Sequence, residues 1–134
     1  MNKTIEVISN SKYTFRLLEG KSDPFDLTNV LSLVDFLFLE WGLEEHLLIT
    51  GGYNQAIQFS EDPQDIAYGS YMEGMQVVML ALDVENIEEV YLTVAHELYH
   101  YKQDADGTLG MSGDYENEAE KKAIEAVKEW KEQK

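Results

Sequence analysis

The most informative residues of this chain form the run His96-Glu97-Leu98-Tyr99-His100, which has the pattern HExxH. On an α-helix, residues four positions apart lie one above the other on the same face. Two imidazoles in that arrangement can bind one Zn²⁺ ion, at about 2.0–2.1 Å each. A bound zinc ion lowers the pKa of a water molecule to about 7, and the adjacent glutamate can take its proton. The pattern predicts a hydrolytic zinc site with His96 and His100 as ligands and Glu97 as general base.

The residues before the motif predict the helix that this chemistry needs. Asn86 is a typical N-cap residue, and Glu89 follows three positions later, as in a capping box. Apolar and aromatic residues then recur at helical spacing: Ile87, Tyr91, Val94, Leu98 and Tyr101. We expect this stripe to face a core, with both histidines on nearly the opposite side.

A catalytic zinc ion usually has three protein ligands, so a third ligand must come from elsewhere in the chain. The chain has no cysteine, and we expect its third histidine, His46, to be a strand residue near a turn. No histidine occurs in residues 101–110, which excludes the metzincin arrangement of ligands. A carboxylate is therefore the expected third ligand.

A second helix, starting near residue 114, offers that carboxylate. Ser112 or Asp114 could cap it, and its apolar stripe consists of Ala119, Ala123, Ala126, Val127 and Trp130. Glu116 projects into the middle of this stripe, where a carboxylate is costly unless it is paired or bound to metal. Glu116 is therefore predicted as the third ligand. Glu120, one turn further along the same side, is predicted to orient a ligand imidazole, whereas Glu118 points toward solvent.

These two helices resemble the gluzincin branch of the zincin metallopeptidases, in particular the minigluzincins and the ImmA/IrrE-type peptidase domains. The likeness lies in HELYH followed by ExxAxxxA, and it covers residues 86–127. It implies an α+β, zincin-like fold: a small, twisted, mostly antiparallel sheet with a backing helix, an HExxH helix and a C-terminal ligand helix. It also implies a residue that stabilises the oxyanion, for which Tyr71, Tyr115 and Tyr68 are candidates.

The rest of the chain predicts the scaffold. Alternating residues around Asn10-Ser11 predict an N-terminal hairpin, and residues 24–41 predict a buried backing helix that ends at Gly42. Strands are expected at residues 46–50, 54–59 and 76–82, with a long loop over residues 60–75. In zincins an extended substrate lies along the edge strand of the sheet, and residues 54–59 are predicted as that edge.

Composition limits the classes of function. A chain of 134 residues predicts a single domain over residues 1–134. Its net charge of −16 would repel nucleic acid, so no nucleic-acid partner is expected. The longest apolar stretch, residues 25–41, is too short and too polar to span a membrane. The absence of cysteine and of a signal peptide favours the cytoplasm.

Together these observations predict a zinc metallopeptidase that hydrolyses a peptide or protein substrate. One alternative is a zinc-bound regulatory or interaction module without catalysis. A second alternative is an acidic decoy protein that binds a basic partner and no metal. Nothing in the sequence fixes the oligomeric state.

Overall fold

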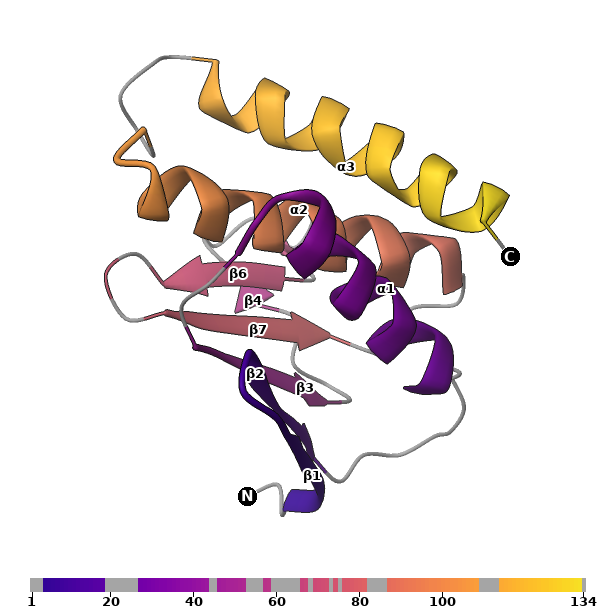
Figure 1. Cartoon of the computed structure of the whole chain (residues 1–134). Coiled ribbons are helices and arrows are strands. Elements are labelled where there is room, and N and C mark those ends of the chain that lie inside the picture. The colour runs from indigo at the N-terminus through magenta and orange to yellow at the C-terminus, as the bar shows by residue number, and fades with distance from the viewer. Residues whose placement is uncertain are drawn as a thin grey trace.

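The computed structural model describes residues 4–18, 27–43, 46–52, 57–58, 66–67, 69–72, 74, 76–81, 87–108 and 114–133. Within these residues the chain is α+β, with a five-stranded sheet and three helices that lie on one side of it (Figure 1). The predicted α+β class is confirmed. None of the helices in this part of the chain is both long enough and apolar enough to cross a bilayer.

The sheet begins with the predicted N-terminal hairpin, in which β1 (Thr4–Ser9) and β2 (Tyr13–Leu18) pair antiparallel. The side chain of Asn10 closes the turn. Its Oδ1 atom accepts hydrogen bonds from the backbone N–H groups of Lys12, at 2.8 Å, and Tyr13, at 3.0 Å. Such a bond from an asparagine to the backbone two residues on mimics a backbone turn.

The remaining strands make the sheet mixed, so the prediction of a mostly antiparallel sheet is wrong. β3 (Leu47–Gly52) runs parallel to β2, and β7 (Val77–Ala81) runs parallel to β3. β6 (Gly69–Met72) then pairs antiparallel with β7 at the edge. For β2 and β3 the reason is the connection through α1 (Leu27–Glu40), because a helical crossover returns the chain to the start of the next strand in the same direction.

The prediction that residues 54–59 form the edge of this sheet is also wrong. The described part of that segment, β4 (Ile57–Gln58), pairs with β5 (Ile66–Ala67) in a separate two-stranded sheet. The strand order of the main sheet is β1-β2-β3-β7-β6. The edge next to the helices is therefore β6.

β6 lies in the segment 60–75 that was expected to be a loop. Its pairing with β7 depends on a reversal of the chain in which Gly74 has a φ of 77° and Gln76 has a φ of 56°. Positive φ values twist a tight turn in the sense that suits the two strands it joins. The strands predicted at 46–50 and 76–82 are present as β3 and β7.

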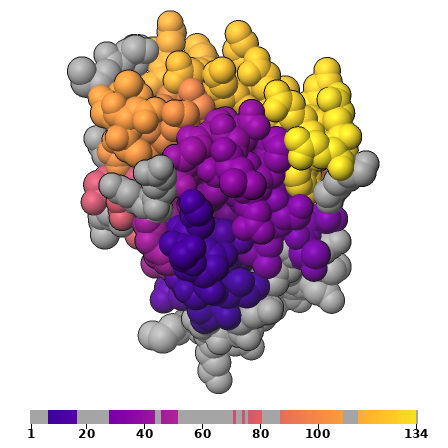
Figure 2. Space-filling model, viewed as in Figure 1, coloured from indigo at the N-terminus to yellow at the C-terminus, as the bar shows by residue number. Residues whose placement is uncertain are grey.

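α1 is the predicted backing helix, but it is not buried on all sides. Its inner face packs into the core through Val30, Leu33, Val34, Leu37 and Phe38. Its outer face is at the surface (Figure 2). Leu39 of this helix is 81% exposed. Because all three helices share one side of the sheet, α1 has neighbours on part of its circumference only.

α1 ends at Gly42, as predicted. Gly42 has a φ of 61°, a left-handed conformation that favours glycine. The backbone N–H of Leu43 donates to the carbonyl oxygen of Phe38 at 2.9 Å. The backbone N–H of Gly42 donates to the carbonyl oxygen of Leu39 at 3.3 Å. These two bonds form a Schellman motif, which satisfies carbonyls that the helix end leaves free.

The predicted motif helix and ligand helix are α2 (Ile87–Ala105) and α3 (Tyr115–Glu132). α2 packs between the sheet and α3, and the ring of Tyr91 meets that of Trp130 edge-on at 5.0 Å. Asp114 holds the N-cap position of α3, but its side chain makes no capping hydrogen bond. The other two predicted caps, Asn86 and Ser112, lie outside the described residues.

Candidate metal centre

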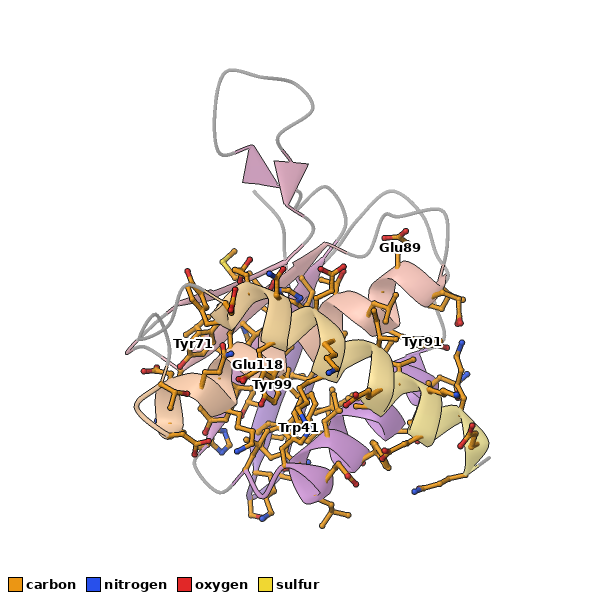
Figure 3. The ribbon with its side chains drawn as sticks, turned by 90° about the horizontal axis from the view of Figure 1, so that it is seen from above. Trp41, Tyr71, Glu89, Tyr91, Tyr99 and Glu118 are labelled. Atoms are coloured by element: carbon orange, nitrogen blue, oxygen red, sulfur yellow. The ribbon has the colours of Figure 1, made fainter. Side chains whose placement is uncertain are left out.

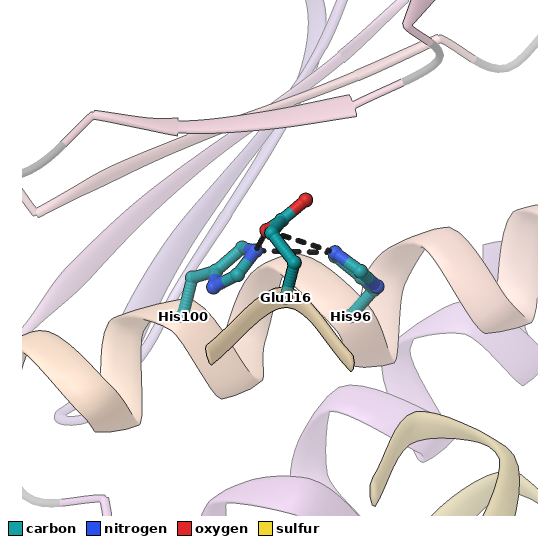
Figure 4. A group of neighbouring side chains, drawn as sticks. All are labelled: His96, His100 and Glu116. Atoms are coloured by element: carbon teal, nitrogen blue, oxygen red, sulfur yellow. Dashed lines mark hydrogen bonds and ion pairs between the residues drawn. The ribbon is translucent and has the colours of Figure 1, made fainter. Parts of the chain in front are cut away.

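The structure brings His96, His100 and Glu116 together at the junction of α2 and α3 (Figure 4). The two histidines are one helical turn apart on α2, and Glu116 projects toward them from the first turn of α3. Their Nε2 atoms lie 3.1 Å apart, and the distance from His96 Nε2 to Glu116 Oε1 is 3.6 Å. His100 Nε2 is in close contact with the same carboxylate oxygen.

This group of residues could hold a metal ion, and its donor atoms suit zinc. A tetrahedral zinc site with ligands at about 2.0–2.1 Å has ligand atoms about 3.3–3.4 Å from one another. Two of the three separations, 3.1 and 3.6 Å, lie on either side of that value, and the third, between His100 Nε2 and Glu116 Oε1, is shorter. Two imidazole nitrogens and one carboxylate oxygen are also a donor set found in catalytic zinc sites.

Glu97 lies beside the group in a buried position. Its side chain is in the interior, where the residue is only 8% exposed. Burial raises the pKa of Glu97 to about 8, and the negative charge of Glu116 adds to the effect. The carboxyl groups of Glu97 and Glu116 are therefore close enough to interact electrostatically. A cation between them would oppose both effects, because a nearby opposite charge favours the ionised carboxylate.

The surroundings of His96 favour its neutral form. Burial lowers the pKa of His96, and the positive charge of His100 lowers it further, while Glu116 acts in the opposite direction. A histidine must be neutral to bind a metal, so burial keeps His96 ready to bind. Glu120 is exposed on α3 and also opposes the lowering of this pKa through its charge. Within the part of the chain that the structure describes, it makes no hydrogen bond or ion pair with His96 or His100.

His100 has a hydrogen-bond partner that the sequence did not predict. Its Nδ1 atom lies 2.8 Å from Oε1 of Gln103. The Nε2 atom of Gln103 in turn donates to Glu118 Oε1 at 3.1 Å. Glu118 is exposed, as expected, but it also accepts this hydrogen bond. A polar residue three positions after the second histidine lies on the same side of the helix, and this spacing was a usable signal.

The candidate oxyanion residues occupy different places. The ring of Tyr115 lies against His100, with 5.8 Å between the ring centroids. Tyr71, on β6, donates its hydroxyl to Asp104 Oδ2 at 2.5 Å. Tyr68 lies outside the described residues. The third histidine, His46, is exposed just before β3, within 2.8 Å of the hydroxyl of Thr14, so it is separate from the metal group.

No family model, curated protein or solved structure matches this chain. The chemistry of the site therefore has to be inferred from its own residues: three converging donor atoms and one buried carboxyl group beside them.

Proposed function

We propose that this chain is a zinc-dependent peptidase with a zincin-like fold of the gluzincin type. His96, His100 and Glu116 would bind the metal, and Glu97 would act as general base. The observation that supports this most strongly is the convergence of two imidazole Nε2 atoms and a carboxylate oxygen beside the buried Glu97. When bound, a zinc ion polarises a carbonyl group and lowers the pKa of a water molecule to about 7.

In this mechanism Glu97 moves the proton. It takes a proton from the attacking water and delivers it to the amine that leaves when the peptide bond breaks. Its burial fixes the carboxyl group next to the ligands and keeps bulk water away from it. An acid-base group is most effective when its pKa lies near the working pH. Without a metal, burial raises the pKa of Glu97 to about 8, and a bound cation would lower it from there.

A peptide or protein substrate fits the edge of the sheet. β6 is an edge strand, so one side of its backbone can pair with an extended peptide by strand addition. Glu97 lies one helical turn before Tyr101, whose ring packs against Tyr71 of β6 at 5.9 Å. An extended chain paired with β6 would therefore pass along the side of α2 that carries the proposed base.

To test the proposal, the zinc-loaded protein is incubated with a mixture of internally quenched fluorogenic peptides, and the rate of hydrolysis is measured. Glu97→Gln should retain zinc and lose about 10²–10⁴-fold in rate, the usual contribution of a general base. The matched control is Glu89→Gln. Glu89 lies on the same helix but is exposed near its other end, so this variant should hydrolyse as fast as the wild type (Figure 3).

Unchanged turnover in Glu97→Gln would refute the mechanism. Stoichiometric zinc with no hydrolysis by the wild type would favour the zinc-bound regulatory module instead. A wild type that neither binds zinc nor hydrolyses any peptide would favour the acidic decoy protein, whose binding to a basic partner weakens with added salt.

A further inference from the structure

Gln103 connects the two helices that carry the proposed ligands. It lies on α2 one turn after His100 and is only 2% exposed. Its side-chain amide makes three hydrogen bonds: with His100 Nδ1 at 2.8 Å, with the carbonyl oxygen of Tyr115 at 3.0 Å and with Glu118 Oε1 at 3.1 Å. One partner is a proposed ligand on α2, and the other two belong to the first turn of α3.

These partners determine which way the amide of Gln103 points. A backbone carbonyl and a carboxylate both accept hydrogen bonds, so the NH₂ group must face Tyr115 and Glu118. The amide oxygen then faces His100 Nδ1, and because that oxygen can only accept, Nδ1 must carry the proton. The lone pair of the neutral imidazole is left on Nε2, the atom that points toward His96 and Glu116.

The same amide also holds the third ligand in place. Tyr115 is the residue before Glu116, so the bond to its carbonyl fixes the backbone next to the ligand against α2. Glu118 is held from a second direction, because it also lies beside Tyr99 of α2 (Figure 3). The pKa of Tyr99 is raised mainly by burial and, to a smaller extent, by the charge of Glu118. The first turn of α3 is therefore fixed by side chains of α2.

His96 differs from His100 in this respect. Among the described residues, its Nδ1 atom has no hydrogen-bond partner, and its side chain is 25% exposed, compared with 9% for His100. Side-chain hydrogen bonds therefore orient His100 and the backbone next to Glu116, but not His96. Gln103 contacts both of those positions, directly or through the neighbouring carbonyl.

We propose that Gln103 is the positioning residue of this site, which selects the tautomer of His100 and sets Glu116 at the right distance from it. The inference rests on the proposed metal centre and does not depend on hydrolysis. Partners that orient metal-binding histidines commonly change metal affinity about 10–100-fold when they are removed.

The first test compares zinc affinities by competition with a chromophoric chelator. Gln103→Leu removes all three hydrogen bonds at similar side-chain volume, and Gln103→Glu places a carboxylate against Glu118 and the carbonyl of Tyr115. Gln103→Leu should weaken zinc binding about 10–100-fold. Gln103→Glu keeps an acceptor for His100 Nδ1 but repels the first turn of α3, so it should weaken binding less. The double variant Gln103→Glu/Glu118→Gln restores an amide donor opposite the new carboxylate, and it should recover most of the lost affinity.

Two controls separate positioning from general stability. Glu118→Gln alone keeps an acceptor for Gln103 and should change the affinity little. Val94→Ala truncates a fully buried side chain on the same helix, so it should lower the free energy of unfolding while leaving zinc affinity unchanged. An equal loss of affinity in Val94→Ala and Gln103→Leu would overturn the proposal.

The second test needs neither metal nor substrate. In the ¹⁵N NMR spectrum of the metal-free protein, at a pH where the imidazole is neutral, His100 should carry its proton on Nδ1. That proton should exchange slowly in the wild type and rapidly in Gln103→Leu. A proton on Nε2 instead, or unchanged zinc affinity in Gln103→Leu, would overturn the proposal. The Nδ1 proton supports it even if no peptide is hydrolysed, so failure of the proposed activity and failure of this inference are separate results.

Discussion

The hydroxyl of Tyr71 donates a 2.5 Å hydrogen bond to Asp104 Oδ2, which joins the edge strand β6 to the last turns of α2. The backbone N–H of Gly74 donates to the same carboxylate oxygen at 3.0 Å. One carboxylate thus holds both the strand and the turn that follows it. This contact ties β6 to α2, the helix that carries two of the proposed metal ligands.

We predict that Tyr71→Phe and Asp104→Ala each lower the free energy of unfolding by about 1–2 kcal/mol, because each removes the hydrogen bond between the hydroxyl and the charged carboxylate. In Tyr71→Phe/Asp104→Ala the loss should be smaller than the sum of the two, since both changes remove the same contact. Urea denaturation measures all three. The control is Asp106→Asn, which removes only an exposed pair with Lys102 and should have almost no effect. Additive losses would show that the two side chains do not interact.

Metal content tests the ligand group directly. Elemental analysis of the purified protein should find one zinc ion per chain, and His96→Ala and Glu116→Ala should each lose it. His46→Ala is the matched control, because His46 is exposed and separate from the group, and it should keep the metal. Zinc retained in Glu116→Ala would move the third ligand to Glu120 or another carboxylate. No metal in any form, even after zinc is offered, would refute the metal centre.

Removal of the metal should destabilise the fold where α2 meets α3. A ligand present at 100 times its dissociation constant stabilises the native state by about 2.7 kcal/mol. For a domain of this size that corresponds to a rise in Tm of about 10 °C. Calorimetry of chelator-treated protein, with and without added zinc, measures the shift. His100→Ala should show no shift, and magnesium should not replace zinc, because it prefers six oxygen ligands. The same zinc-induced shift in His100→Ala would contradict the site.

The elements predicted from the sequence are those whose signal is local. The helical periodicity around His96 and His100 depends only on residues within a few turns, and α2 has the expected stripe. Glu116 was identified because it interrupts the apolar stripe of α3. The structure places it beside the two histidines, but its side chain is 61% exposed and not buried as the stripe suggested. The hairpin at Asn10 and the helix end at Gly42 were likewise predicted from short turn patterns.

What could not be predicted depends on distant partners. β6 contains a glycine and has only four residues, so its sequence lacks the alternation that marks a strand, and its pairing with β7 defines it. The direction of β3 follows from the packing of α1 on the sheet. The role of Gln103 depends on a backbone carbonyl twelve residues away, at Tyr115, which no side-chain pattern reveals.

The hydroxyl of Tyr13 donates to Asp35 Oδ1 at 2.8 Å, and this pair, which is not part of the proposed metal group, predicts a pH dependence of stability. Burial, together with Asp35, raises the pKa of Tyr13 from 10.0 to about 12. The native state therefore keeps this proton at a pH where the unfolded chain has released it. The stabilisation is complete below about pH 10 and is lost as the pH rises through about 12, with a total of about 2–3 kcal/mol. Urea denaturation across this range should show a fall in the wild type that is smaller in Tyr13→Phe, while Asp35→Asn should lower the apparent pKa. An equal fall in the wild type and in Tyr13→Phe would assign the effect to other tyrosines.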